Sequence, residues 1–284
     1  MTDIILGGYG QLGTYIYEKL NKKAIKLSSS DCNITIPKNI EKVFKKYKPS
    51  YVFNCSAYHN TNECEINPQL SFDINSVSLK YLSDFCNLHN SKLIHFSSDY
   101  VFNGKSKNKY TEKSQPDPIN IYGISKYAGE QIVKYYCKKY LICRISSVYS
   151  IKECKAKKDG NFVDKIIANS KNNFIKVTTQ KITPSFCEDI ADQLIYIYKK
   201  INNKLIHISP PDSTTWYQFA KYINKELKLG TRIKKNLTNN ENINRPVNSA
   251  LKSSILINES FYKMSDWRKG FKKYKKTIKK TKIE

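Results

Sequence analysis

The sequence lacks any cluster of metal-binding side chains. Its eight cysteines stand apart at positions 32, 55, 64, 86, 137, 143, 154 and 187, without a C-x-x-C spacing, and its four histidines are scattered as well. Such spacing is typical neither of a zinc site nor of a disulfide framework. We therefore predict free thiols, no bound metal and a reducing compartment.

Long apolar runs are also lacking. No stretch approaches the roughly 20 apolar residues that a membrane-spanning helix requires. The first ten residues, "MTDIILGGYG", are typical of a strand that enters a glycine turn, and they do not resemble a signal peptide. These observations predict a cytoplasmic protein with no membrane partner.

Arginine is scarce in a chain that is otherwise strongly basic. The formal net charge is +25, yet only four of the 49 basic residues are arginine, the side chain best suited to paired hydrogen bonds with phosphate. The lysines are spread along the chain, with one concentration in "RKGFKKYKKTIKK" at 268–280. No nucleic-acid-binding motif accompanies the charge. We predict a lysine-rich surface with an amphipathic helix in the tail, and no nucleic-acid partner.

The first half of the chain alternates between short β-rich runs and helical periodicity. The expected strands are "DIILGG", "KAIKLS", "YVFNCSA", "KLIHFSS" and "LICRISSVYS", and amphipathic segments separate them. One of these segments, "PQLSFDINSVSLKYLSDFCNLHN", is expected to be a single long helix, and another begins near Ile121. Alternation in this order predicts an α/β fold, with a Rossmann-type doubly wound parallel sheet.

The second half has a looser pattern. We expect a dinucleotide-binding core at 1–146, and a sheet completed by strands near 174–179 and 204–208. The rest of 147–284 cannot close a sheet by itself. It is expected to form a small substrate-binding lobe and closing helices over the carboxyl ends of the strands, where open α/β sheets bind ligands.

A glycine turn follows the first expected strand. "GGYGQLG" places Gly7, Gly10 and Gly13 between a strand and a helix. The first glycine permits a tight turn, the second lets the backbone approach a pyrophosphate, and the third allows close packing of helix on sheet. Because the strand-turn-helix context is present, the motif predicts a dinucleotide site at the helix N-terminus.

The end of the second strand bears on the choice of nucleotide. NAD sites usually place an acidic residue there, which holds the ribose 2′-hydroxyl. Here Ser28, Ser29 and Ser30 come first and Asp31 lies beyond, with Lys26 close by. Hydroxyl groups and a lysine accommodate a 2′-phosphate, whereas a carboxylate repels it. The sequence favours NADP(H) as the preferred cofactor, with NAD(H) as an alternative.

Tyrosine precedes lysine by four residues at five places, so the spacing alone identifies no catalytic pair. One pair, Tyr122 and Lys126, starts the helix that follows "HFSSDYVF", and Ser98 ends the strand in that segment. A tyrosine that protonates a carbonyl needs its pKa of about 10 brought towards working pH, and we expect the Lys126 ammonium to do this. Ser98 is expected to face the same cleft.

Taken together, these motifs resemble the extended short-chain dehydrogenase/reductases, and among them the dTDP-4-dehydrorhamnose reductase family. The resemblance rests on the glycine turn, "SSDYVFNG", "NIYGISKYAGE" and "NCSAYHNTNECEINP", and runs almost the full length. Later landmarks in the same order are "GNF", "QKITPS", "STTWYQFA", "RPVNSAL" and "DWRKGF".

The resemblance implies NAD(P)H-dependent reduction of the C4 keto group of a nucleotide-linked 4-keto-6-deoxyhexose. It implies Tyr122 as general acid, Lys126 as the residue that tunes it and binds ribose, and Ser98 as the group that polarises the carbonyl. The implied substrate contacts are Tyr100, Asn161, Arg245 and Asn248. The implied cofactor contacts are Gly7, Gly10, Gln11, Leu12, Gly13, Ser28, Ser29, Asn33, Ile34, Cys55, Ser56, Ala57, Tyr122 and Lys126.

Three departures from the family pattern concern the substrate side. Ser147 stands where the family commonly has tryptophan, "SVYSIKECKAKKDGNF" is long and basic, and "QKITPS" lacks a glycine often found there. A UDP-linked or 2-acetamido sugar therefore stays an alternative to a dTDP-linked one. The oligomeric state is left open, with a homodimer common for such folds.

Two other functions stay open at this point. One is a bifunctional 3-epimerase/4-reductase, in which Cys64 or Tyr100 transfers the second proton. The other is a non-catalytic regulatory subunit like that of methionine adenosyltransferase, because the same fold and triad persist there.

Overall fold

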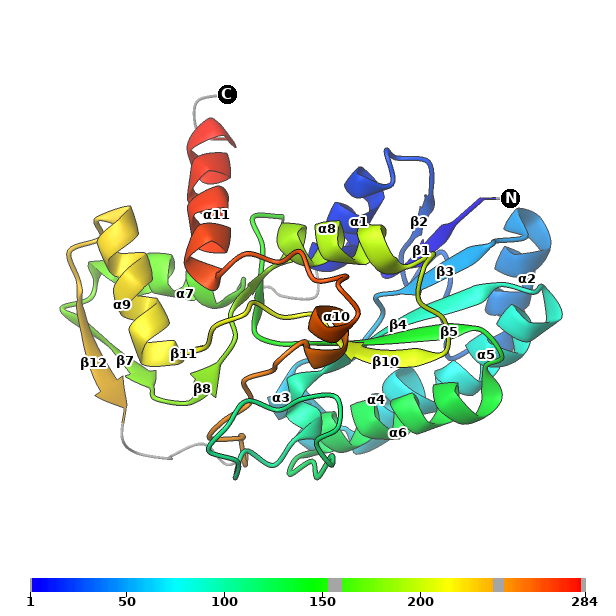
Figure 1. Cartoon of the computed structure of the whole chain (residues 1–284), viewed down its shortest axis with the longest axis horizontal. Helices are drawn as coiled ribbons and strands as arrows, with labels where there is room; N and C mark the ends of the chain where they lie inside the picture. The colour runs from blue at the N-terminus through cyan, green and yellow to red at the C-terminus, as the bar shows by residue number, and fades with distance from the viewer. Residues whose placement is uncertain (1, 153–159, 237–242, 282–284) are drawn as a thin grey trace.

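A parallel sheet of six strands forms the centre of the computed structural model, which describes residues 2–152, 160–236 and 243–281. The strand order is β10-β5-β4-β3-β1-β2, and every neighbouring pair is parallel (Figure 1). The predicted Rossmann-type sheet is therefore confirmed. Its strands are β1 (Ile4–Leu6), β2 (Ile25–Leu27), β3 (Tyr51–Asn54), β4 (Lys92–Ser98), β5 (Tyr140–Ile145) and β10 (Lys204–His207).

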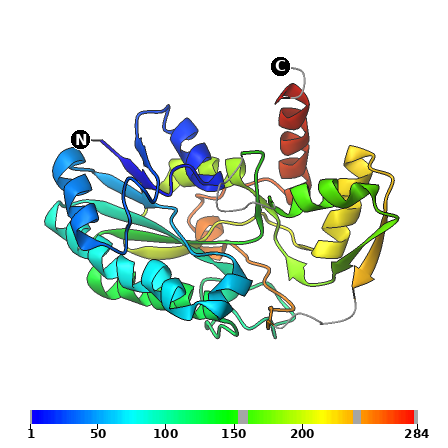
Figure 2. The same ribbon diagram turned by 180° about the vertical axis from the view of Figure 1, so that it is seen from behind.

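Helices cover both faces of this sheet. One face carries α1 and α8, which pack on each other, and the opposite face carries α2, α5 and α6 (Figures 1 and 2). The bounds are α1 (Gln11–Lys19), α2 (Pro37–Tyr47), α5 (Ser78–Leu88), α6 (Ile121–Tyr136) and α8 (Cys187–Ile197).

The central strands are apolar on both faces, as a sheet covered on two sides requires. In β1, Ile5 packs with the cluster under α8, while its neighbours Ile4 and Leu6 pack with the cluster under α2. In β5, Leu141 and Ile142 divide in the same way. This alternation follows from the two-residue period of a strand, and it explains why these segments read as continuous apolar runs.

The long helix expected after the third strand is interrupted. Between α4 (Pro68–Phe72) and α5 lies one π-helical turn, η1 (Asp73–Val77). In this turn the Asn75 amide donates to Tyr58 O over 2.9 Å and to Ser125 Oγ over 3.0 Å, and it accepts from Tyr58 N over 3.0 Å. The widened turn thereby binds this helix to α6 and to the loop after β3.

A small lobe lies beside the carboxyl ends of the strands (Figure 1). Its parallel pair β7 (Phe174–Thr178) and β12 (Arg232–Asn236) packs against α9 (Trp216–Leu227), and α9 also packs on α7 (Phe162–Ala168). The predicted strand near 204–208 joins the central sheet, but the strand near 174–179 does not, so that part of the prediction was wrong. β7 finds its partner in β12, a strand that we did not predict.

The tail predicted as an amphipathic helix forms α11 (Trp267–Thr281). Phe271 and Tyr274 on its apolar face are buried in the core. On its basic face Lys275 pairs with Glu226 over 2.8 Å. The remaining short elements are α3 (Thr61–Ile66), η2 (Asp99–Val101), β6 (Val148–Tyr149), η3 (Asn169–Lys171), β8 (Lys181–Ile182), β9 (Ser185–Phe186), β11 (Thr214–Thr215) and α10 (Ser254–Asn258).

Candidate active site

The glycine turn after β1 is shaped by steric limits that only glycine meets. Gly7 has φ +65°, and a Cβ there would lie 2.9 Å from both Cys55 C and Ser56 N. A Cβ on Gly13 would lie 2.7 Å from Gly7 O, so the first turn of α1 packs directly on the loop. Gly10 is the N-cap of α1, whose free N–H groups face the cleft end of the sheet. This cradle fits a cofactor pyrophosphate.

A cleft of about 260 Å³ opens at the carboxyl ends of β1, β3, β4 and β5. It brings together the glycine turn, the segment after β3, the end of β4 and the first turns of α6, which are far apart in the sequence. Its lining residues are Gly10, Gln11, Leu12, Gly13, Asn54, Cys55, Ser56, Ala57, His59, Phe96, Ser97, Ser98, Asp99, Tyr100, Tyr122, Lys126, Ile145, Ser147 and Val148.

The three residues expected to act on the carbonyl meet in this cleft. Ser98 ends β4, and it lines the same cleft as Tyr122. Tyr122 occupies the first turn of α6, where the Asn120 side chain caps the helix by accepting from Gly123 N over 2.8 Å. Lys126 follows one turn later and is 2% exposed.

The Tyr122 hydroxyl does not have the acidity that we expected. Burial raises its pKa above the usual value, and the nearby Ser98 hydroxyl opposes that rise only in part. Burial outweighs any lowering of this pKa by Lys126, whose Nζ is directed to β4 and donates to Phe96 O over 2.6 Å. Tyr122 is thus held as the protonated phenol, which is the form that a general acid needs.

Lys126 itself is strongly affected by burial. Burial lowers the pKa of its ammonium to about 8, while Glu130 and Cys55 oppose this change. Besides Phe96 O, its Nζ lies 3.5 Å from His95 Nε2. The side chain is therefore fixed between the cleft and the sheet.

Two of the four expected substrate contacts lie together at the cleft mouth. Arg245 Nη1 donates to the Tyr100 hydroxyl over 3.2 Å, and Arg245 Nη2 donates to Asn62 Oδ1 over 3.1 Å. The Tyr100 ring meets the Tyr122 ring edge to face, with centroids 5.7 Å apart. A guanidinium beside this pair of tyrosines suits an anionic ligand.

The other two expected substrate contacts are placed differently. Asn161 caps α7 through Val163 N and Asp164 N, and its amide nitrogen donates to Ser150 O over 2.7 Å. The Asn248 amide donates to two backbone carbonyls of the 106–108 loop and accepts from Ala250 N. Neither residue lines the cleft, and both hold loops around it; their contact with substrate stays a prediction.

Several of the expected cofactor contacts also lie outside the cleft lining. Ser28 donates to Asp31 Oδ2 from its N over 2.8 Å and from its Oγ over 2.6 Å, so the Asp31 carboxylate folds back onto the end of β2. Asn33 Oδ1 accepts from Thr35, and Ile34 is buried in the core under α2. For these residues and for Ser29, as for the expected contacts that line the cleft, cofactor contact stays a prediction.

Sequence analysis missed several buried polar residues around the triad. Asp99 accepts from Ser98 Oγ over 3.1 Å and from Ser146 Oγ over 2.9 Å. His95 on β4 and Asn54 at the end of β3 form a polar pair behind Lys126. Polar side chains inside strands that otherwise read as apolar were the available signal, since such groups stay buried only when they are hydrogen-bonded.

The structure also bears on the alternative of a bifunctional 3-epimerase/4-reductase, in which Cys64 would transfer the second proton. Cys64 is fully buried in α3, its Sγ donates to Tyr58 O over 3.5 Å, and burial raises the pKa of its thiol. It does not line the cleft. The geometry therefore does not favour Cys64 as an acid/base. Of the long basic segment that departs from the family pattern, residues 153–159 lie outside the described part of the chain.

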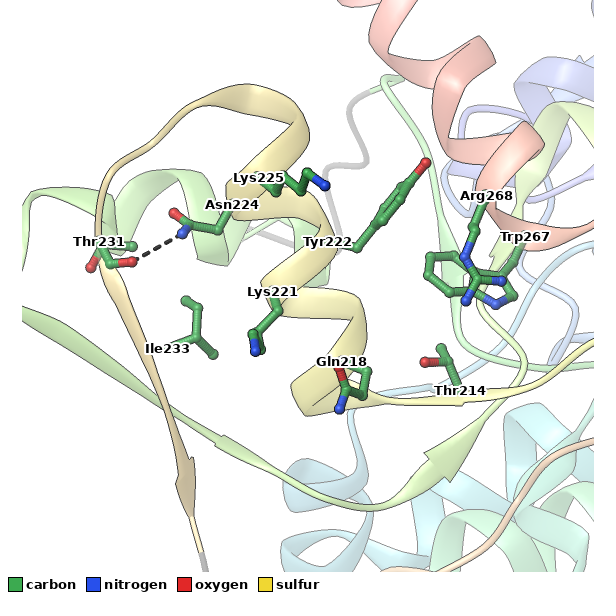
Figure 3. Close-up of a pocket in the computed structure, with 10 residues that line it drawn as sticks. All are labelled: Thr214, Gln218, Lys221, Tyr222, Asn224, Lys225, Thr231, Ile233, Trp267 and Arg268. Atoms are coloured by element: carbon green, nitrogen blue, oxygen red, sulfur yellow. Dashed lines mark hydrogen bonds between the residues drawn. The ribbon is translucent and has the colours of Figure 1, made fainter.

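A second hollow, of about 530 Å³, lies in the small lobe (Figure 3). Lys221, Lys225 and Gln218 of α9 face it, together with Trp267 and Arg268 at the start of α11. None of the residues expected to bind cofactor or substrate lies on it. In the described ranges no group of three or more His, Cys, Asp or Glu side chains is placed to hold a metal ion. Among the same residues, no helix is both long and apolar enough to cross a membrane.

Comparison with known proteins agrees with this geometry. The family model described as RmlD substrate binding domain matches residues 1–280. The spore coat polysaccharide biosynthesis protein SpsK of Bacillus subtilis is 29% identical over 279 residues, which cover 95% of each chain.

Two solved structures share the fold closely. A dTDP-4-dehydrorhamnose reductase from Clostridium acetobutylicum has a TM-score of 0.92 at 27% identity, covering 98% of this chain and 100% of that one. The Bacillus anthracis dTDP-4-dehydrorhamnose reductase, solved in complex with NADP, has a TM-score of 0.89 at 28% identity, covering 96% and 98%. Because the family model matches this chain along almost its whole length, the chain belongs to the RmlD substrate-binding-domain family, that of the dTDP-4-dehydrorhamnose reductases.

Proposed function

We propose that this protein is an NADPH-dependent reductase of the C4 keto group of a nucleotide-linked 4-keto-6-deoxyhexose. The observation that carries the proposal is that Ser98, Tyr122 and Lys126 line one cleft together with the glycine turn. The names of its relatives support a dTDP-linked sugar as the substrate.

The glycine turn and residues 54–57 would hold the cofactor, which supplies a hydride when bound. The protein supplies the proton. Tyr122, kept protonated by burial, donates to the carbonyl oxygen as negative charge develops there. Ser98 orients the Tyr122 hydroxyl and stands next to the oxygen that receives the proton. Lys126, in its ammonium form, would place a positive charge beside the cofactor ribose and the Tyr122 phenol.

The nucleotide diphosphate would be held at the cleft mouth. Arg245, already hydrogen-bonded to Tyr100, gives a guanidinium that pairs with phosphate oxygens. The Tyr100 ring would form a wall for the sugar. Ser147, two residues after β5, stands where the family pattern commonly has tryptophan, and its backbone is in the left-handed region at φ 47°. This leaves room in the cleft beside the reacting carbonyl.

A preference for NADPH over NADH forms part of the proposal. It is supported by the NADP complex of the Bacillus anthracis relative and by the hydroxyl-rich end of β2. A cytoplasmic location and a homodimer are also part of it. Cell fractionation tests the location, and light scattering tests the dimer.

The decisive experiment follows NADPH oxidation with freshly generated 4-keto-6-deoxy sugars. The panel contains dTDP-linked, UDP-linked and UDP-2-acetamido sugars, each with and without a 3,5-epimerase. Turnover of the epimerised dTDP sugar alone is the expected result. Turnover without the epimerase, together with deuterium entering C3 from heavy water, would assign the epimerisation to this chain. Absence of turnover across the panel, with NADPH bound, would refute the proposed activity.

A further inference from the structure

A line of buried polar side chains runs from Lys126 into the central sheet. Asn54 on β3 and His95 on β4 are paired in register, and each is 1% exposed. His95 stands between Lys126 on one side and Asn54 on the other. A polar pair in this position must be hydrogen-bonded, because unpaired polar groups in a core are unfavourable.

The backbone fixes the orientation of the Asn54 amide. Ser56 N donates to Asn54 Oδ1 over 3.1 Å, so the amide oxygen points away from the imidazole. The Asn54 Nδ2 then lies 3.3 Å from His95 Nδ1. An amide NH₂ group only donates, so His95 Nδ1 must accept.

This arrangement selects one tautomer of His95. Burial lowers the pKa of its imidazole well below the usual value, and Lys126 lowers it further, so the ring is neutral. A neutral ring that accepts at Nδ1 carries its hydrogen on Nε2. That hydrogen is directed at Lys126 Nζ, 3.5 Å away.

An N–H group directed at a lysine distinguishes its two protonation states. An uncharged amine has a lone pair that accepts the hydrogen, whereas an ammonium has only donors. Phe96 O accepts from Nζ in both states, so it does not discriminate between them. Among the described residues, the largest electrostatic effects of other groups on Lys126 come from Glu130 of its own helix and Cys55 after β3, and both favour the ammonium.

We propose that His95, oriented by Asn54, is a positioning residue whose Nε2–H favours the uncharged form of Lys126 and so eases the loss of a proton from this lysine. This inference rests on the proposed function of Lys126 beside Tyr122. A group that titrates near the working pH transfers protons efficiently in both directions. A lysine that stayed charged at every working pH could bind the cofactor but could not exchange a proton.

The first test reads the tautomer in the free protein. The ¹⁵N spectrum of histidine-labelled protein at pH 7 should show one ring protonated on Nε2 only, and this ring should vanish in His95→Gln. In Asn54→Asp, a carboxylate oxygen faces Nδ1, and the hydrogen should move to Nδ1. A wild-type His95 protonated on Nδ1, or on both nitrogens, would overturn the proposal.

The second test reads the charge of Lys126 through NADPH binding between pH 6 and 10. If the ammonium binds the cofactor with a pKa of about 8, the wild-type Kd rises about tenfold from pH 7 to pH 9. In His95→Gln, the glutamine amide oxygen can accept from the ammonium. In Asn54→Asp, the hydrogen moves to Nδ1, so the lone pair on His95 Nε2 can accept from it. We expect the rise to fall to about twofold in each variant.

The variant His89→Gln is the matched control and should keep the wild-type profile, because His89 is a half-buried histidine that packs on Phe44 and does not line the cleft. An unchanged profile in a folded His95→Gln variant would overturn the proposal, whatever Asn54→Asp does. Both tests work without a sugar substrate. A protein that reduces no keto sugar but gives the expected spectra would refute the proposed function alone.

Discussion

The Ser98 hydroxyl donates to Asp99 Oδ1 over 3.1 Å. One hydroxyl carries one hydrogen, so Ser98 in this arrangement offers a lone pair to Tyr100 N and has no hydrogen left for the Tyr122 oxygen. The buried Asp99 carboxylate thereby decides which way Ser98 donates. Burial raises the pKa of Asp99, and its hydrogen bonds with Ser249, Ser146 and Ser98 oppose the rise.

Asp99→Asn tests this orientation. An amide can accept from only one of the two serine hydroxyls, so one buried hydrogen bond is lost. A loss of about 1–1.5 kcal/mol corresponds to roughly a tenfold fall in kcat. Stopped-flow or steady-state NADPH oxidation measures it, with Asp117→Asn, which hydrogen-bonds Asn103 near the surface, as the control. Equal activity in the two variants would contradict the role of Asp99.

Tyr122→Phe removes the proton donor and leaves the ring. We expect kcat to fall by a factor of about 10² to 10⁴, the usual contribution of a general acid, while the Kd for NADPH stays unchanged. Tyr135→Phe is the matched control, because Tyr135 lies on the same helix, also precedes a lysine by four residues, and is 82% exposed. A Tyr122→Phe enzyme with nearly wild-type kcat would exclude Tyr122 as the acid.

The pH dependence of the free enzyme should report Lys126. Burial disfavours the charged form, so its pKa is lowered to about 8, and the ammonium exists below that pH and the amine above it. If the ammonium is the active form, kcat/KM falls as the pH rises through about 8. Lys126→Arg, which stays charged, should lose this alkaline limb even where its activity is low. A wild-type limb near 10.5 would show that burial does not act as described.

Cofactor preference should respond to the end of β2. The wild-type enzyme is expected to have a higher kcat/KM with NADPH than with NADH. Asp31→Asn removes the carboxylate that folds back onto Ser28, so it should widen this preference by reducing repulsion of the 2′-phosphate. Ser28→Asp should reverse it. Comparable Michaelis constants for the two cofactors in the wild type would contradict the prediction.

The ion pair between Arg144 and Glu130 should dominate stability among the charged side chains. Arg144 Nε and Nη2 donate to the two Glu130 oxygens over 2.7 and 2.6 Å, and both residues are buried. Glu130→Gln leaves a buried guanidinium without its counter-charge, which should lower the free energy of unfolding by about 3–5 kcal/mol. Urea denaturation measures it. Lys80→Gln, which breaks the exposed pair with Asp84, should change stability by about 0.5 kcal/mol or less.

The central sheet was predictable because its strands carry their signal locally. In β4 and β5 a run of apolar residues, bounded by turns, is enough to indicate a buried strand. β7 was also recognised as a strand, but its partner was not. The partner of β7 is β12, "RIKKN", a charged and mostly exposed strand whose position is set by contact with α9 and not by its own composition.

The candidate site was also only partly predictable from the sequence. Gly7, Ser98, Tyr122 and Lys126 stood out because each belongs to a motif with a fixed spacing. The direction of the Lys126 Nζ could not be predicted in this way. It depends on contacts with Phe96 O and His95 on β4, about 30 residues earlier in the chain. The long-range hydrogen bonds that give Asn161 and Asn248 their places have no sequence signature either.

Strand β10 reaches the sheet late in the chain. It pairs with β5, although β5 ends at Ile145 and β10 begins at Lys204, so a large part of the small lobe is made between them. On the ribosome, the N–H and C=O groups along the outer edge of β5 therefore stay open until residues 204–207 emerge. An open edge of this kind pairs readily with other chains. The time needed to translate the residues between β5 and β10 thus sets the shortest period for which this edge of the nascent protein is open to aggregation.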